Sequence, residues 1–591
     1  MTYEEKLSKI RNQMKADRVE AYIIPSADPH MSEYLPKHYK CIPFVSGFTG
    51  SAGTLVITHD FAGLWTDFRY FEQALPQLAK SGFELVKQKV QHAPEYIQWL
   101  TEKLPAGAVV ATDEKLLSVL LGDLLTQQFS AKGMELQSKD YLSPIWENRH
   151  ELPADPAFLI EDQHIGQSVS SKLAAIRSAL KKHQADYHLI SSLDDLAWLF
   201  NIRGKDVSYN PVVLSFALIN HDHATLFINP DKLTEEEKVA LLKSGTEILP
   251  YEEIERALTQ IPANSSIFID PKRNCYAYAK LIPDGVRIIK ETNPSTNLKA
   301  VKNETELQNT REAMLKDGVA ITQFLKWLDD HSGKIKITEL SAAAQLRSYR
   351  AAQDGFIGDS FNTISAYKDH GALPHYAPSA ESDAEVIAES LFLVDSGGQY
   401  FYGTTDITRT IPMGETTDQE KKDYTLVLKG MIDGCKAIFP KGTCGYQIDA
   451  ITRNPLWAHG VNYGHGTGHG VGYFLNVHEG PQVFNPTNTP VPVELGMITS
   501  IEPGIYRPGR HGIRIENLVY TIPVETNEFN EFYGFETLTI APIHTSIIVK
   551  DLLEKSQLDW LNTYHAAVFE KLSPRLTTEE RQWLQEATKA I

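Results

Sequence analysis

The first part of the chain alternates amphipathic segments with short apolar runs. Residues 4–19, EEKLSKIRNQMKADRV, repeat their apolar positions at the spacing of a helix that is buried on one side. The runs at 21–25 (AYIIP), 53–58 (GTLVIT) and 62–67 (AGLWTD) have the length and composition of strands. Because helix and strand patterns alternate, residues 1–155 are predicted to form an α/β domain.

The same pattern returns further along the chain. Residues 171–201 resemble residues 5–35, because in each an amphipathic helix leads into an apolar strand and a Ser-x-Asp step. Residues 156–298 are therefore predicted to form a second α/β domain that duplicates the first, with two unrelated α/β domains as the alternative. Polar, proline-containing stretches at 146–158 and 291–303 are expected to be linkers.

Residues 299–591 are predicted to form a third domain. It begins with a long amphipathic helix for which Asn303 is the expected N-cap, and Glu306 completes a capping box. The pattern then mixes long helices with glycine-rich strands up to about residue 550. The tail from Asp551 is helical and polar, and we expect it to be an appendage without visible chemistry.

Composition narrows the class of protein. A chain of 591 residues is too long for one hydrophobic core, and a net charge of −18 disfavours nucleic acid or an anionic membrane as a partner. We expect no membrane span and no signal peptide, because no long apolar run occurs and the N-terminal segment is charged. Since the four cysteines form no CxxC pair, a reducing, cytoplasmic location is expected.

Four carboxylates accompany apolar strand patterns in the third domain. Asp395 ends the run SLFLVD, Asp406 lies on the next predicted strand, Glu502 follows MITSI, and Glu516 lies inside GIRIENLVYTI. A carboxylate in such an apolar setting is costly to bury without a cation or a donor. For Asp395 alone, an aspartate that caps the following Ser-Gly-Gly turn is the alternative. Together with a histidine, the four could neutralise two divalent cations.

Histidines and glycines alternate in GHGTGHGVG at 464–472. His465 and His469 have the spacing of a helical HExxH zinc site, but the glycines exclude a helix and position 466 is not glutamate. The stretch also lacks the Lys-Ser/Thr of a phosphate-binding loop. A glycine-lined strand along which a substrate lies is the remaining functional interpretation, with a tight turn as the structural one. His375 and His478 are lone histidines beside apolar residues, which are either structural or catalytic.

The combination of these motifs resembles a known family. Four segments occur in the order found in pita-bread metallopeptidases, namely DSGGQYFYGTTDITRT (395–410), HGTGHGVGYFLNVHEGP (465–481), SIEPGIY (500–506) and GIRIEN (512–517). More narrowly, the whole chain is similar to the long, three-domain, cytosolic Xaa-Pro aminopeptidases (aminopeptidase P). The resemblance implies an α/β (α+β) protein in which two creatinase-like domains, 1–155 and 156–298, precede a pita-bread catalytic domain with a helical tail, 299–591.

The resemblance also implies roles for individual residues. It gives a site for two divalent metal ions, Mn²⁺ before Co²⁺ or Zn²⁺, with five ligands: Asp395, Asp406, His469, Glu502 and Glu516. His375, His465 and His478 align with substrate-facing, catalytic histidines, and Arg514 matches an arginine two residues before the last ligand.

The implied activity is release of the N-terminal residue from peptides with proline in second position. A hydroxide that bridges the metals attacks the Xaa-Pro carbonyl, and Glu502 is the expected proton shuttle. A homodimer is expected, with Trp457 either at the contact or in the core. The alternatives are an Xaa-Pro dipeptidase with identical ligands and a peptide-binding module without catalysis.

Overall fold

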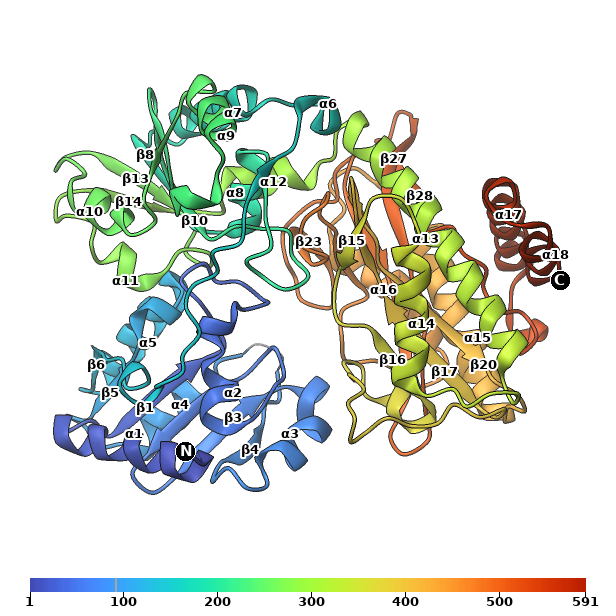
Figure 1. Ribbon diagram of the computed structural model, residues 1–591, viewed down its shortest axis with the longest axis horizontal. Helices are drawn as coiled ribbons and strands as arrows, with labels where there is room; N and C mark the ends of the chain where they lie inside the picture. The colour runs from blue at the N-terminus through green and yellow to red at the C-terminus, as the bar shows by residue number, and fades with distance from the viewer. Residues whose placement is uncertain (91–92) are drawn as a thin grey trace. The chain divides into compact units, whose positions relative to one another are not determined.

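The computed structural model describes residues 1–90 and 93–591, which form two compact units. The first contains residues 1–162 and 167–295, and the second contains residues 163–166 and 296–591 (Figure 1). The further division of the chain at residues 155 and 298 stays a prediction, although each of the first two predicted ranges contains one six-stranded sheet.

The sheet of the N-terminal range has the strand order β4-β3-β2-β1-β5-β6. Its central strand β1 is AYIIP, buried at every residue, which runs antiparallel to β2 and parallel to β5. The capping box of Thr2 and Glu5 starts the helix α1, which buries Leu7, Ile10 and Met14. The bounds are α1 (Tyr3–Asp17), β1 (Ala21–Pro25), α2 (Cys41–Ser46), β2 (Thr54–Thr58), β3 (Ala62–Thr66), α3 (Phe71–Leu78), β4 (Glu84–Lys87), α4 (Tyr96–Lys103), β5 (Val109–Thr112), α5 (Val119–Ala131) and β6 (Glu135–Ser138).

The second sheet repeats this topology. Its order is β12-β11-β10-β8-β13-β14, and its sequence of antiparallel and parallel pairs is that of the first sheet. The predicted duplication is therefore confirmed at the level of strand order and direction. The bounds are α7 (Val169–Lys182), β8 (Tyr187–Ile190), α8 (Leu193–Leu199), β10 (Ser215–Asn220), β11 (Ala224–Ile228), α9 (Glu235–Lys243), β12 (Thr246–Leu249), α10 (Glu253–Thr259), β13 (Ser266–Ile269), α11 (Tyr276–Ala279) and β14 (Arg287–Lys290).

The expected linker at 291–303 is only partly a linker, because it contains the helix α12 (Pro294–Ala300). Lys299 in its last turn and Lys302, two residues beyond its end, are both buried. Both amino groups contact the buried carboxylate of Glu479, with Lys299 Nζ 3.0 Å from Oε2. Buried charges have to be paired, so this cluster fixes the end of α12 to Glu479 within the second unit. Sequence pattern alone gave no sign of the pairing, because its partners are far apart in the chain.

The second unit begins with α13 (Glu304–His331), and the predicted capping box of Asn303 and Glu306 is present. Two sheets form its centre, β16-β17-β20 and β21-β28-β27-β24-β22-β23, and β25 pairs with β26. The bounds are α14 (Glu339–Ala351), β16 (Ile364–Tyr367), β17 (Leu391–Ser396), β18 (Gly398–Tyr400), β19 (Gly403–Thr404), β20 (Ile407–Pro412), α15 (Asp418–Cys435), β21 (Phe439–Pro440), α16 (Gly445–Trp457), β22 (Gly468–Gly470), β23 (Glu479–Phe484), β24 (Ile498–Ile501), β25 (Gly504–Arg507), β26 (His511–Arg514), β27 (Asn517–Thr526) and β28 (Glu531–Thr537).

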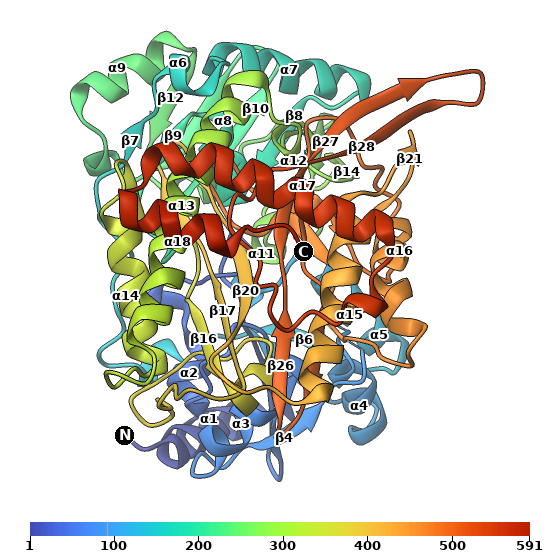
Figure 2. The ribbon, with the colours of Figure 1, turned by 90° about the vertical axis from the view of Figure 1, so that its right-hand side faces the viewer.

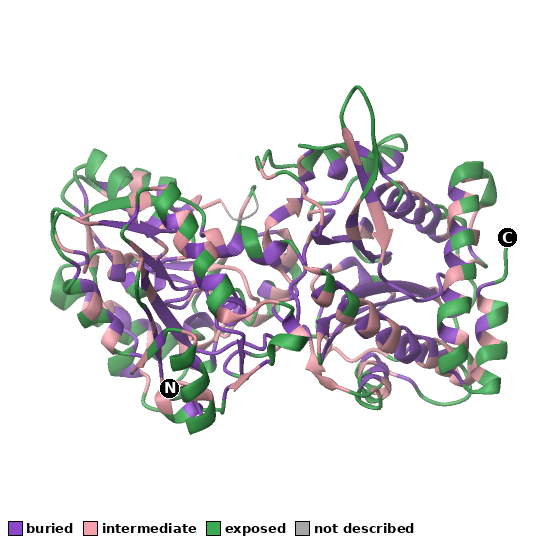
Figure 3. Ribbon diagram, turned by 90° about the horizontal axis from the view of Figure 1, so that it is seen from above, coloured by how far each residue is buried: buried purple, intermediate pink, exposed green. Residues whose placement is uncertain are grey.

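The C-terminal tail is not the appendage that its polar pattern predicts. Its helices α17 (Lys555–Leu572) and α18 (Thr578–Ala587) lie side by side along the second unit (Figure 2). Leu561, Val568, Leu572 and Leu584 are buried in the same core as residues of α15 and of the large sheet. In Figure 3 buried and exposed residues alternate along both helices, so each helix has one buried side and one exposed side.

None of the helices among residues 1–90 and 93–591 is long and apolar enough to cross a membrane. All four cysteines carry free thiols, and three of them, Cys41, Cys275 and Cys435, are buried.

Candidate active site

Two of the candidate carboxylates come from the small sheet. Asp395 lies on β17, which is buried at all six positions, and it pairs in register with Thr408 of β20. Asp406 immediately precedes β20. Because the two strands are neighbours, their paired register brings two carboxylates separated by ten residues to one end of the sheet.

The other candidates come from the large sheet. His469 is the middle residue of β22, and Glu502 directly follows β24, as its pattern predicts. Glu516 does not lie inside a strand, contrary to prediction, because it occupies the step between β26 and β27. Its amide donates to the carbonyl of Thr408 at 3.1 Å, which turns the chain from the β25–β26 hairpin into the large sheet.

The five side chains meet between the two sheets. His469 Nε2 lies 3.5 Å from Asp406 Oδ2 and 3.4 Å from Glu502 Oε1. Asp406, His469 and Glu516 each offer one potential ligand atom, and these three atoms all lie within 4.8 Å of one another. Burial raises the pKa of Asp395, and the charge of Asp406 raises it further, whereas the charge of Arg514 lowers it.

The imidazole of His469 is oriented for ligation through Nε2. Its Nδ1 lies 3.0 Å from the carbonyl oxygen of Gly470, so Nδ1 carries the proton and Nε2 faces the carboxylates. Burial by itself lowers the pKa of His469, but the hydrogen bond to Asp406 and the charge of Glu502 outweigh it and raise the pKa to about 9. A metal cation bound at Nε2 of His469 would therefore replace the proton that the neighbouring carboxylates favour on this imidazole.

The carboxylates repel one another in a buried setting. Burial raises the pKa of Glu516 well above its usual range, and the charges of Asp406, Glu502 and Asp395 raise it further. Burial likewise raises the pKa of Glu502 to about 7. Two buried oxygen atoms, Asp395 Oδ1 and Glu516 Oε1, have no hydrogen-bond partner among the described residues. Orphaned acceptors on repelling carboxylates fit a site built for cations.

Arg514 neutralises one of these carboxylates. Its Nη2 and Nε donate to Asp395 Oδ2 at 2.6 and 3.1 Å, and both side chains are at most one-tenth exposed. The opposite edge of the guanidinium donates from Nη1 to the hydroxyl of Tyr506 at 2.6 Å. Among the described residues, Arg514 thus pairs with Asp395 and not with Glu516.

Tyr506 is a site residue that the sequence analysis did not single out. Its hydroxyl lies 2.7 Å from His465 Nε2 and also accepts from Arg514, so it connects the histidine to Asp395 through the guanidinium. Burial raises its pKa to about 12, which keeps the phenol protonated. Its place at the end of the SIEPGIY motif, four residues after Glu502, was the signal available in the sequence.

The three candidate histidines join the site in different ways. The ring of His478 packs edge-on against that of His469, with centroids 4.3 Å apart. His465 reaches the site through Tyr506. His375 follows Pro374, whose carbonyl oxygen accepts from Arg514 Nη2 at 3.3 Å. The segment that carries His375 is therefore bound to the guanidinium of Arg514.

The segment that carries His375 is fixed by a buried carboxylate outside the site. Glu339, the first residue of α14, is fully buried and accepts from His370 Nδ1 at 2.8 Å and from the Tyr376 hydroxyl at 2.7 Å. Two backbone amides of the same region, those of Tyr367 and Ala384, complete its hydrogen bonds. Glu339 therefore anchors the chain on both sides of His375.

Two glycines of the histidine-rich stretch, Gly468 and Gly470, lie close against the backbones of neighbouring segments. A side chain at Gly468 would meet the carbonyl oxygen of Ser500 at 1.8 Å, and one at Gly470 would meet that of Glu479 at 2.3 Å. These glycines therefore let β22 approach the backbones of its neighbours in the protein. The expectation that a substrate lies along these glycines stays a prediction.

The family comparisons match four consecutive stretches of the chain. Residues 6–146 and 148–306 each match the creatinase/prolidase N-terminal domain, residues 308–522 match metallopeptidase family M24, and residues 531–591 match the C-terminal region of peptidase M24. The chain is 38% identical to a probable Xaa-Pro aminopeptidase P of Sordaria macrospora, over 99% of this chain and 98% of the relative. It is 38% identical to aminopeptidase P2 of Arabidopsis thaliana, over 100% of this chain and 88% of the relative.

Solved structures agree with these relatives. The X-prolyl aminopeptidase from Caenorhabditis elegans, described as a cytosolic enzyme with a di-nuclear active site, superposes with a TM-score of 0.95 at 35% identity and covers 100% of both chains. A prolidase from Pyrococcus horikoshii reaches a TM-score of 0.50 at 23% identity over 63% of this chain, which shows a shared fold only.

Proposed function

The chain belongs to metallopeptidase family M24, and from this premise we propose that it is an Xaa-Pro aminopeptidase, which releases the N-terminal residue from peptides with proline in second position. The observation that carries the proposal is the meeting of four carboxylates and one imidazole in a chain similar over its full length to such enzymes.

We assign Asp395, Asp406, His469, Glu502 and Glu516 as ligands of two divalent cations. Four carboxylates balance two such cations in charge, and oxygen ligands with one imidazole suit Mn²⁺ in preference to Co²⁺ or Zn²⁺. The orphaned oxygens of Asp395 and Glu516 support the assignment. When bound, such cations supply Lewis acidity and make water nucleophilic near neutral pH.

The chain's own residues would move protons and hold the substrate. Glu502 takes a proton from the attacking water and delivers it to the proline nitrogen as the Xaa–Pro bond breaks. Its Oε1 accepts from Ser500 Oγ at 3.1 Å, which restricts the carboxylate to one orientation. His478 or His375 donates to the carbonyl oxygen on which negative charge develops. Asp395 is held by Arg514, whose positive charge favours the ionised form of the carboxylate.

Selectivity for proline would come from the residues around His465. We place the proline next to His465, whose ring is fixed by Tyr506 and by the carbonyl of Gly466 at 2.7 Å. Proline brings no N–H, so its pocket needs no acceptor for one. The free amino group of the substrate pairs with the acidic ligands, which explains action at the N-terminus.

A metal-exchange assay tests the proposal. Protein stripped with a chelator is expected to lose its hydrolysis of an Arg-Pro-Pro peptide and to regain it with Mn²⁺, more than with Co²⁺ or Zn²⁺. Comparing an Xaa-Pro dipeptide with an Xaa-Pro-Yaa-Yaa peptide separates the aminopeptidase from an Xaa-Pro dipeptidase, the second candidate. If the protein binds these peptides but cleaves none of them with any of the metals, both peptidase assignments are wrong and a peptide-binding module is favoured.

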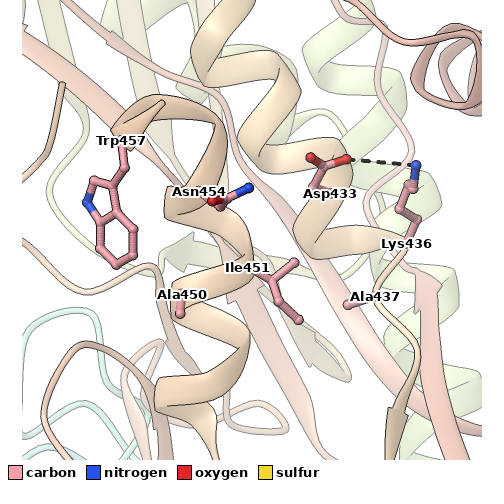
Figure 4. Close-up of a pocket in the computed structure, with 7 residues that line it drawn as sticks. All are labelled: Asp433, Lys436, Ala437, Ala450, Ile451, Asn454 and Trp457. Carbon is pink, nitrogen blue, oxygen red and sulfur yellow. Dashed lines mark ion pairs between the residues drawn. The ribbon is translucent and has the colours of Figure 1, made fainter. Parts of the chain in front are cut away.

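We also propose that the protein is a cytoplasmic homodimer. Four free thiols suit a reducing compartment. The contact is placed on α15 and α16, where Trp457 is 48% exposed and Ile438, just after α15, is 62% exposed. Figure 4 shows the shallow depression on this face, lined by Asp433, Lys436, Ala437, Ala450, Ile451, Asn454 and Trp457. A second copy of the chain is the proposed occupant.

Replacing Trp457 by glutamate is expected to convert the dimer to a monomer, because a charge replaces the largest exposed apolar side chain of this face. Light scattering coupled to size exclusion measures the mass. The matched control is Leu242→Glu, which changes a 58% exposed residue of α9 and should leave the dimer intact. A Trp457→Glu protein that keeps the wild-type mass would refute this contact.

A further inference from the structure

The buried guanidinium of Arg409 joins the C-terminal region to the candidate metal centre. Arg409 lies on β20 and is only 4% exposed. Its Nη1 donates to the carbonyl oxygen of Glu516 at 2.6 Å, and its Nη2 donates to Asn517 Oδ1 at 3.0 Å. Thr408, the preceding residue, donates to the Glu516 side chain at 2.8 Å. The backbone and the carboxylate of Glu516 are thus held from adjacent positions of one strand.

Besides the carbonyl oxygen of Thr408, which lies 3.0 Å from Nη1, the remaining acceptors of Arg409 come from the C-terminal region. Its Nε donates to the carbonyl of Pro542 and its Nη2 to that of Ala541, both at 3.0 Å, and Nη2 also lies 3.1 Å from the Tyr564 hydroxyl. These acceptors are all neutral. Because an unsatisfied buried cation is costly, the guanidinium can stay at this place only while the C-terminal acceptors are present.

Tyr564 holds the C-terminal acceptors in place. Its hydroxyl donates to the carbonyl of Ala541 at 2.8 Å or to that of Thr539 at 3.1 Å, and it lies 3.3 Å from the amide of Ala541. Its ring stacks on Trp560 of the same helix, α17, with planes 7° apart. One phenol oxygen therefore connects α17, the 539–541 segment and Arg409.

We propose that the C-terminal region helps to determine the metal affinity of the centre. Tyr564 is a positioning residue: its hydroxyl holds Arg409, and Arg409 in turn holds Glu516. The inference rests on the proposed function, because it takes Glu516 to be a ligand. It assigns a role to helices whose sequence carries no catalytic motif. Residues that orient a ligand without touching the metal typically change metal affinity by 10–100-fold.

Tyr564→Phe removes only the phenol oxygen and keeps the ring that stacks on Trp560. The matched control is Tyr424→Phe on α15, since Tyr424 is also buried and its hydroxyl donates to a carbonyl of the same segment, that of His544, at 2.7 Å. Titration calorimetry with Mn²⁺ is expected to show affinity about tenfold weaker for Tyr564→Phe and unchanged for Tyr424→Phe. Equal affinities in wild type and Tyr564→Phe, or equal losses in both variants, overturn the inference.

A measurement on the unaltered protein covers the case in which Tyr564→Phe does not fold. The amides of Ala541 and Ile543 donate to Tyr564 and to His565 Nε2, at 3.3 and 3.1 Å. Their hydrogen exchange is expected to slow when Mn²⁺ binds, because coupling between two sites is reciprocal. Unchanged exchange on a protein that binds Mn²⁺ overturns the inference alone, whereas a wild-type protein that binds no Mn²⁺ overturns the proposed function as well.

Discussion

Replacing Glu502 by glutamine is expected to lower kcat for an Xaa-Pro peptide by a factor of about 10³. The amide keeps an oxygen that can ligate a metal, but it cannot accept the proton of the attacking water. Glu502 is suited to that transfer because burial raises its pKa to about 7 and it lies 3.4 Å from His469 Nε2. Steady-state kinetics with the metal content measured in the same samples separates a lost base from a lost metal.

The control for this change is Glu531→Gln, which alters a half-buried glutamate on β28 that pairs with Lys441. It should leave kcat unchanged. The role of Glu502 as proton shuttle is wrong if its glutamine variant retains more than about a tenth of the wild-type kcat with both metals bound.

Replacing Arg514 by methionine is expected to cause a large loss of stability. Asp395 would keep a buried charge without its guanidinium partner, and breaking such a pair typically costs about 3–5 kcal/mol. The melting temperature of metal-free protein should fall accordingly. Added Mn²⁺ should restore a large part of the loss, because a cation at the proposed site faces the same carboxylate.

The protein contains a matched pair for comparison. Arg350 donates from Nε to Asp317 at 2.7 Å, and both residues are buried as deeply as Arg514 and Asp395. Arg350→Met should therefore destabilise the protein by a similar amount, but Mn²⁺ should recover none of that difference. If Mn²⁺ recovers both variants equally, Asp395 does not face a metal.

The sequence pattern was sufficient for the elements that carry the ligands. Asp395 and Glu502 follow apolar runs, and the structure places both at the ends of buried strands. The repeat of 5–35 in 171–201 led to the duplicated sheet because helix and strand periodicities are local properties. The capping box at Asn303 is equally local and was equally visible.

The features that escaped prediction depend on contacts between distant segments. Glu516 was expected inside a strand, since its neighbours alternate, but its amide bonds to Thr408, which is remote in sequence. The use of Gly468 and Gly470 depends on the backbones of Ser500 and Glu479. The tail appeared polar because only one side of each helix is buried, and nothing in its composition indicates a link to Arg409.

The positions of the site residues along the chain also determine at which stage of protein synthesis the metal centre can assemble. A chain emerges from the ribosome N-terminus first, and domains fold in that order. Both N-terminal sheets can therefore form while the strands of the catalytic unit are still unmade. The centre needs residues from Asp395 on β17 to Glu516 after β26, and its support extends to Tyr564. The nascent chain therefore has no assembled centre until almost its last helix has emerged, so a protein truncated by premature termination should be devoid of activity even when its first domains are native.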